Sequence, residues 1–156
     1  MKIILGTALF AFAAVAVVVA STPYLIVHSR FGLPFDAGSL RFSGLVPMAA
    51  GALFWLWSAW DFVFFGRGTP APLYPPRNLV SRRLYRLVRN PMYLAVALML
   101  LGEALVFGSL TLLAYALAVW LVFHLFVVYF EEPNLGAFGG QYDEYRSRVS
   151  RWLPRF

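Results

Sequence analysis

Long apolar segments constrain this chain more than any other feature of its sequence. They cover residues 3–27, 44–65, 91–107 and 110–130, and neither the first nor the last of them carries a formal charge. A transmembrane helix needs about 20 mainly apolar residues. Only 13% of the chain is charged, against about 25% in a typical soluble domain. The sequence therefore predicts an all-α integral membrane protein with about four transmembrane helices, and it argues strongly against a soluble globular enzyme.

The connections between these segments predict how the helices are arranged. Gly108 and Ser109 alone separate the third and fourth segments, and so short a link predicts an antiparallel helical hairpin. The first segment begins like a signal peptide, but its apolar run continues to Val27, so we interpret it as a retained helix. We treat residues 1–156 as one membrane domain, in which residues 1–66 supply two N-terminal transmembrane helices.

The distribution of cations predicts the orientation in the membrane. If both termini face the cytoplasm, all of the 13 Lys and Arg residues except Arg30 and Arg41 lie on that side, as the positive-inside rule requires. The loop at 67–90 and the tail at 131–156 then share the cytoplasmic face. We read the net charge of +6 as a topology signal and an attraction to anionic lipid headgroups, with no nucleic acid as a partner.

The cytoplasmic segments carry most of the polar chemistry. Four prolines within residues 67–78 exclude a regular helix there and predict an extended loop. In the tail, aromatic and apolar residues recur at roughly helical spacing, which predicts a C-terminal amphipathic helix at the membrane interface. These residues are Phe138, Tyr142, Tyr145, Val149 and Trp152.

The usual catalytic and metal-binding motifs are absent from the sequence. The chain contains no cysteine, and its two histidines, His28 and His124, have no partner at metal-ligand spacing, so we predict no metal site. We expect His124 to form a hydrogen bond between membrane helices.

Three acidic positions require an explanation. Glu103 lies deep in an apolar run, so it is either a functional group or a residue that reaches water or a hydroxyl near the far end of its helix. Asp61 lies nearer an interface, where a structural role is expected. Glu131 and Glu132 follow the fourth segment directly, at a helix end whose dipole disfavours acids. This pair predicts a cationic partner, which is either an arginine of the 77–89 loop or a bound cationic ligand.

The start of the third helix is marked by Asn90 and Pro91. Asparagine is a favoured N-cap, and proline suits the first helical turn. The free backbone amides there could hold an anionic group such as a carboxylate. The alternative is a plain capped helix with its arginines on lipid headgroups.

Several motifs in the second half of the chain resemble those of a known enzyme superfamily. They are Arg89-Asn90-Pro91-Met92-Tyr93, Glu131-Glu132-Pro133-Asn134-Leu135, Phe138-Gly139 with Tyr142 and Tyr145, and Val149, Arg151, Trp152 and Pro154. In this order they resemble the isoprenylcysteine carboxyl methyltransferase and phospholipid methyltransferase superfamily, and bacterial members in particular. The resemblance covers about residues 66–156, so residues 67–156 form the expected cofactor-binding region.

The resemblance implies an enzyme of the bacterial cytoplasmic membrane that uses S-adenosylmethionine. The methyl acceptor would be a lipophilic small molecule or a lipid headgroup, methylated on a carboxylate, amine or hydroxyl. Glu131 could meet the ammonium of the cofactor, the start of the third helix its carboxylate, and the Tyr93 ring its sulfonium or adenine. These two helix ends should therefore meet. The positions carried over as cofactor-binding are Arg77, Asn78, Leu79, Val80, Tyr85, Asn90, Pro91, Met92, Tyr93 and Glu131.

Departures from the family pattern limit the substrate and leave alternatives open. Arg83 stands where a glycine is common, which bears on the loop conformation. Val127 stands where the prenylcysteine enzymes carry an arginine thought to serve the acceptor carboxylate, so it argues against a prenylcysteine acceptor. Glu132 and Glu103 are the candidates for accepting a proton from an amine. The alternative functions are a small transporter or channel subunit that uses Glu103, and a family member that binds without turnover.

Overall fold

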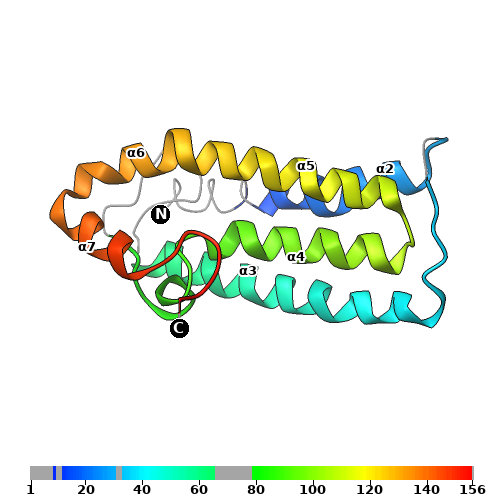
Figure 1. The fold of residues 1–156 in the computed structure, drawn as a ribbon, viewed down its shortest axis with the longest axis horizontal. Helices are drawn as coiled ribbons and strands as arrows, with labels where there is room; N and C mark the ends of the chain where they lie inside the picture. The colour runs from blue at the N-terminus through cyan, green and yellow to red at the C-terminus, as the bar shows by residue number, and fades with distance from the viewer. Residues whose placement is uncertain (1–8, 10–11, 31–32, 66–78, 156) are drawn as a thin grey trace.

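The computed structural model describes residues 9, 12–30, 33–65 and 79–155, and this part of the chain is helical without any β-strand. A helix over Phe12–Val27 contains the π-helical turn η1 (Val17–Ser21) and α2 (Thr22–Val27), and the short 3₁₀ helix η2 (Gly38–Gly44) leads into α3 (Leu45–Phe65). α4 (Pro91–Val106) and α5 (Leu110–Phe126) follow. Together these helices run along the long axis of the molecule (Figure 1). The proline-rich loop at 67–78 lies outside the described residues.

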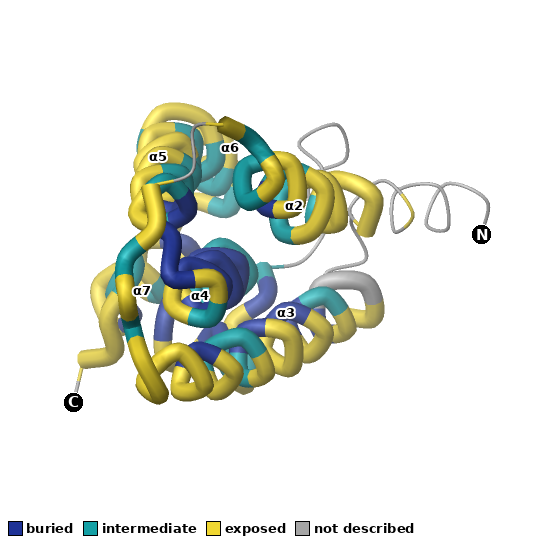
Figure 2. The backbone as a smooth tube through the Cα atoms, turned by 90° about the vertical axis from the view of Figure 1, so that its right-hand side faces the viewer, coloured by how far each residue is buried: buried dark blue, intermediate teal, exposed yellow. Residues whose placement is uncertain are grey.

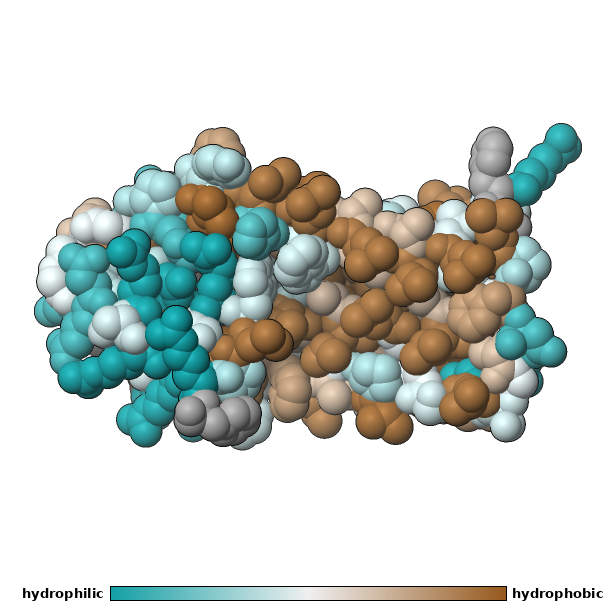
Figure 3. All heavy atoms as spheres, in the orientation of Figure 1, coloured by the Kyte–Doolittle hydropathy of each residue, from teal (hydrophilic) through white to brown (hydrophobic). Residues whose placement is uncertain are grey.

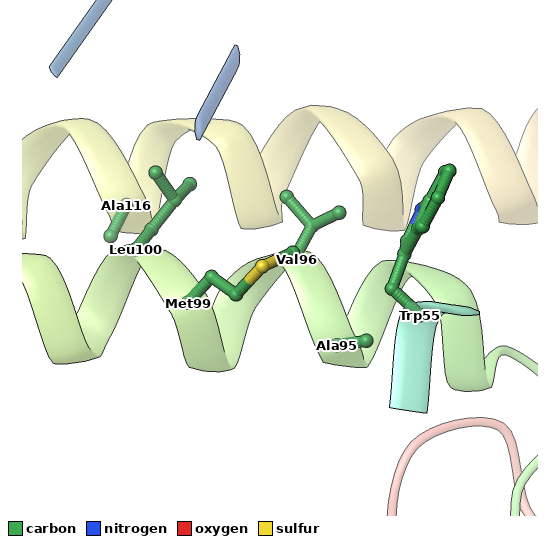
Figure 4. Packing of buried hydrophobic residues seen from close by; sticks show 6 residues of the cluster. All are labelled: Trp55, Ala95, Val96, Met99, Leu100 and Ala116. Atoms are coloured by element: carbon green, nitrogen blue, oxygen red, sulfur yellow. The ribbon is translucent and has the colours of Figure 1, made fainter. Parts of the chain in front are cut away.

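α4 is the central helix of the bundle. It packs against α3 on one side and α5 on the other, and Figure 2 shows its buried residues between these two neighbours. Trp55 of α3 and Ala116 of α5 join α4 residues in one buried cluster, shown in Figure 4. The α4 members of this cluster are Ala95, Val96, Met99 and Leu100.

The α3–α4 contact is close because glycines lie between the two helices. A Cβ placed on Gly51 would lie 2.6 Å from the carbonyl oxygen of Ala95, and one on Gly102 would lie 2.5 Å from the carbonyl oxygen of Gly44. Only residues without a side chain allow backbones to approach so closely. This contact fixes the position of α4, which carries part of the predicted site at its N-terminus.

Two helices in the described part of the chain are long and apolar enough to cross a membrane. They extend over Gly38–Asp61 and Leu110–Phe138, and the apolar helices Phe12–Val27 and Pro91–Val106 are shorter. Large apolar side chains on the outside of α3 and α5 are exposed, among them Leu53, Trp60 and Leu121. Figure 3 shows a hydrophobic middle and a hydrophilic end, as expected for a membrane protein with one polar face.

The predicted hairpin between the third and fourth segments is confirmed. α4 ends at Val106 and α5 begins at Leu110, and the Ser109 hydroxyl accepts a hydrogen bond from the Leu112 amide (3.2 Å). Gly108 adopts φ +55°, and a Cβ there would lie 2.5 Å from the Phe35 carbonyl oxygen. Glycine is therefore required at this turn.

The helix that contains Glu131 and Glu132 does not end where the sequence predicts. α5 continues without interruption through the π-helical turn η4 (Val127–Glu131), α6 (Glu132–Leu135) and the 3₁₀ turn η5 (Gly136–Phe138). The prediction that the acid pair lies at a helix C-terminus is therefore wrong. Because the helix continues to Phe138, neither glutamate lies at its C-terminus, and the unfavourable dipole effect expected there does not arise. Single π turns within α-helices are frequent at functional sites.

The C-terminal helix is shorter than predicted and packs against the protein. α7 covers Gly140–Arg148, and the chain after it turns back across the end of the bundle beside the segment that precedes α4 (Figure 1). Tyr142 is 3% exposed, and Val88 and Ser150 form a parallel β-bridge. The aromatic face expected to lie on lipid is used instead for contacts within the protein, because residues 79–90 supply polar and apolar partners for it.

Candidate functional site

The start of α4 forms one side of the candidate site. Pro91 is the first residue of the helix, as predicted, and is buried. Asn90 occupies the N-cap position, but its side chain does not cap the helix; its Nδ2 donates to the carbonyl oxygen of Arg151 (3.3 Å). The prediction of an asparagine cap is therefore wrong: the Asn90 amide is held by the C-terminal tail through Nδ2, and its Oδ1 accepts no hydrogen bond from the first turn of α4. The first turn of α4 consequently has no side-chain cap.

Tyr93 and Glu131 join this helix start to the π turn after α5. The Tyr93 hydroxyl donates to Glu131 Oε1 at 2.8 Å, across 38 residues of sequence. The Phe123 ring lies beside the Tyr93 ring, with centroids 4.7 Å apart. Glu131 forms no ion pair with any of the described residues. The predicted meeting of the start of the third helix with the acid pair is confirmed. Among the described residues, no cation pairs with the Glu131 carboxylate, which lies at the Tyr93 hydroxyl.

Glu132 faces a different environment from its neighbour. Arg151 binds it with two hydrogen bonds, from Nε to Oε1 (2.7 Å) and from Nη2 to Oε2 (2.9 Å). Arg89 Nη1 lies 3.1 Å from Oε1 of Glu132 and also donates to the Tyr142 hydroxyl (3.0 Å). The side chains of Arg89 and Glu132 are 10% and 13% exposed, so water screens this pair only weakly.

These contacts answer the question of the cationic partner for the acid pair. For Glu132, the predicted arginine of the 77–89 loop is Arg89, so that alternative is confirmed. The second arginine, Arg151, was not anticipated as a partner, although it belongs to one of the recognised motifs. Its hydrogen bond to Glu132 raises the pKa of Arg151, and burial raises the pKa of the Tyr142 hydroxyl. Both groups therefore stay protonated and can donate at neutral pH.

The other predicted cofactor positions that the structure describes lie in the segment before α4 and in its first turn. Val80 and Tyr85 are each 7% exposed, Leu79 and Met92 are half-buried, and Arg77 and Asn78 lie outside the described residues. The carbonyl oxygen of Tyr85 accepts a hydrogen bond from the Tyr145 hydroxyl (2.7 Å). Burial raises the pKa of Tyr145, which keeps this hydroxyl protonated.

Arg83 retains a glycine-like backbone at the position where the family commonly has glycine. Its φ is +50°, and it is the one non-glycine residue with positive φ in the described part of the chain. Its guanidinium Nη1 donates to Asp61 Oδ1 of α3 (3.2 Å), and Asp61 is fully buried. The expected structural role of Asp61 is confirmed by this ion pair. The strained backbone is stabilised by a contact that the sequence pattern did not indicate.

Three further residues singled out from the sequence have clear positions. His124 Nδ1 accepts a hydrogen bond from Trp152 Nε1 (3.0 Å), so its expected hydrogen bond exists, with a partner in the tail rather than in a membrane helix. Val127 is fully buried. Glu103 is 6% exposed, and within the described part of the chain its Oε2 has no hydrogen-bond partner. It lies about 15 Å from Tyr93 along α4, at 1.5 Å per residue.

Comparison with known proteins identifies a family. A family model described as phospholipid methyltransferase matches residues 40–139, which is more than half of the chain. The match includes α3, α4, α5 and both glutamates of the candidate site. It confirms the resemblance that the motifs indicated. A comparison with curated proteins gives no match.

Proposed function

The chain belongs to the phospholipid methyltransferase family, and on this basis we propose that it is an S-adenosylmethionine-dependent methyltransferase of the membrane. Its acceptor in this proposal is a lipophilic small molecule or a lipid headgroup, methylated on a carboxylate, amine or hydroxyl. The observation that carries the proposal is the 2.8 Å contact between Tyr93 and Glu131.

The residues at this contact fit the chemistry of the cofactor. S-adenosylmethionine has a positive sulfur, an ammonium and a carboxylate, and when bound it supplies a methyl group on an already activated carbon. Glu131 would hold the ammonium, since it forms no ion pair with the described residues. The uncapped first turn of α4 would hold the carboxylate through backbone amides. A cation over the ring of Tyr93 or Phe123 would gain about 0.5–2 kcal/mol.

The work of this chain in the proposed reaction is alignment. Tyr93 orients the Glu131 carboxylate by donating a hydrogen bond to it, and the apolar residues of α4 and α5 exclude water from the lipid side. Positioning of the reacting groups and exclusion of water supply most of what a displacement on an activated carbon needs. Val127 is fully buried and offers no charge to an acceptor carboxylate, which supports an acceptor other than prenylcysteine.

The proposed topology places the site at the cytoplasmic face. We propose that the helices Phe12–Val27 and Pro91–Val106 cross the membrane together with the two longer ones, and that both termini are cytoplasmic. The concentration of hydrophilic residues at the end that carries α7 (Figure 3) supports this orientation.

Isothermal titration with S-adenosylhomocysteine tests the proposed function. The folded protein in detergent should bind this ligand, and Glu131→Gln and Tyr93→Ala should each weaken binding by about tenfold or more, which is about 1.4 kcal/mol. Tyr129→Phe is the matched control, because Tyr129 is 68% exposed on the same π turn as Glu131. A folded protein that does not bind, or two site variants with wild-type affinity, would refute the assignment.

Glu103 favours a second candidate function, which is ion- or proton-coupled transport. Glu103 is 6% exposed and its Oε2 has no hydrogen-bond partner among the described residues, and buried acids in membrane helices often lie on ion pathways. Proton flux into vesicles that contain the protein distinguishes the two functions. Flux that Glu103→Gln abolishes, with unchanged binding of S-adenosylhomocysteine, would support transport.

A further inference from the structure

The segment after α7 connects the two helix ends that form the candidate site. We propose that Arg151 and Glu132 are positioning residues, which hold the start of α4 against the turn between α5 and α6 and thereby keep Tyr93 in contact with Glu131. This inference rests on the proposed function for its consequence on cofactor binding. The link between the start of α4 and the turn that carries Glu131 is inferred from the contacts of residues 150–152.

Glu132 is placed so that it can act on both sides of the site. It follows Glu131 directly in the chain, at the first position of α6. Arg89, which binds it at 3.1 Å, lies two residues before the first residue of α4. The Arg89–Glu132 pair therefore joins the helix that carries Tyr93 to the turn that carries Glu131. Arg151 completes the cluster with two further hydrogen bonds to Glu132.

Three consecutive residues of the tail reinforce this junction. The Ser150 carbonyl oxygen accepts from the Arg89 amide (2.9 Å), and the Arg151 carbonyl oxygen accepts from Asn90 Nδ2 (3.3 Å). Trp152 Nε1 donates to His124 Nδ1 of α5 (3.0 Å). The 150–152 segment thus contacts the entrance of α4 on one side and α5 on the other. Contacts of this kind restrict the movement of one helix end relative to the other.

The burial of the cluster indicates that it contributes more than a surface ion pair. The Arg89, Glu132 and Arg151 side chains are 10%, 13% and 31% exposed, whereas Arg148 and Glu144 of α7 form a pair that is 74% and 61% exposed. Exposed pairs contribute little because water screens them, while loss of one partner of a shielded pair leaves an uncompensated charge. Arg148 is therefore a matched control for Arg151.

The same contacts favour a positioning role for Glu132 over its role as a candidate proton acceptor. A carboxylate held by two arginines is stabilised in its charged form, so it accepts a proton poorly. The 150–152 segment lies beyond the family match, which ends at residue 139, although Arg151 belongs to one of the recognised motifs.

The test measures affinity and stability together. Arg151→Ala and Glu132→Gln should each weaken binding of S-adenosylhomocysteine about tenfold in isothermal titration. The double variant should bind no more weakly than Glu132→Gln alone, because that change already removes the carboxylate that Arg151 binds. Arg151→Lys should recover part of the affinity, and Arg148→Ala should bind like the wild type. Variants that melt earlier but bind with unchanged affinity would show a purely structural role and overturn the proposal.

A second measurement reads the link without the cofactor. Hydrogen exchange at the backbone amide of Leu94, which donates to the Asn90 carbonyl oxygen (3.2 Å), should accelerate in Arg151→Ala and stay unchanged in Arg148→Ala. Unchanged exchange in both variants would overturn the positioning role. If the wild type fails to bind S-adenosylhomocysteine while exchange responds as expected, the proposed function fails and the structural link between the tail and α4 stands.

Discussion

Replacement of Gly51 by alanine tests whether the close approach of α3 and α4 determines both stability and the geometry of the site. The new Cβ would lie 2.6 Å from the Ala95 carbonyl oxygen and 3.0 Å from the Met99 amide nitrogen. Ordinary van der Waals contact begins at 3.4 Å, so the helices must separate by about 0.8 Å. The obstructing atoms include backbone atoms, which cannot rotate away as a flexible side chain can.

The magnitude follows from two opposing effects. Overpacking against a rigid neighbour costs about 3 kcal/mol at the upper end of its usual range, and the better helix propensity of alanine returns about 1 kcal/mol. We therefore expect Gly51→Ala to lower the free energy of unfolding by about 2 kcal/mol. It should also weaken binding of S-adenosylhomocysteine, because Ala95 lies two residues from Tyr93 and a shift of α4 disturbs the 2.8 Å hydrogen bond to Glu131.

Equilibrium unfolding in mixed detergent micelles, followed by circular dichroism, measures the change in the free energy of unfolding. Gly136→Ala is the control, because an added Cβ there meets nothing within 4 Å and its φ of −56° suits any residue; it should change stability by less than about 0.5 kcal/mol. If Gly51→Ala proves as stable as Gly136→Ala, the close α3–α4 packing is refuted, together with its supposed effect on the site.

Two further changes test the buried acidic residues. Arg83→Gly relieves the positive φ but removes the arginine that pairs with the fully buried Asp61, so it should lower the free energy of unfolding by about 1–3 kcal/mol. Adding Asp61→Asn should recover most of this loss in the same unfolding assay, and an Arg83→Gly variant more stable than the wild type would contradict the reasoning. Glu103→Gln removes a buried carboxylate whose Oε2 has no hydrogen-bond partner among the described residues, so it should raise the free energy of unfolding by about 1 kcal/mol. The affinity for S-adenosylhomocysteine, measured by isothermal titration, should stay unchanged, whereas a loss of affinity would place Glu103 in the site.

The sequence predicts the local features of the site better than its contacts. Pro91 marks the start of α4 because proline suits only the first turn of a helix. The motifs also predict that Tyr93 and Glu131 meet. The pairing of Arg151 with Glu132 and the loss of the Asn90 cap were not predictable, since Arg151 lies 19 residues from Glu132 and 61 from Asn90 and reaches both only when the tail folds back. Sequence rules for helix caps consider only neighbouring residues, so they do not predict a hydrogen bond to a distant segment.

The sequence by itself determined the helical segments, the hairpin and the family, because each depends on local apolar length, on a two-residue link or on ordered motifs. The tertiary structure alone decided which helix is central. All the segments are similarly apolar, because a side chain that faces lipid and one that faces the protein interior are both apolar. Hydropathy therefore does not distinguish the buried α4 from the lipid-facing surfaces of α3 and α5. The tertiary structure also decided the partners of Glu132, because Arg89 and Arg151 are distant from it in sequence and come together with it only in the folded chain.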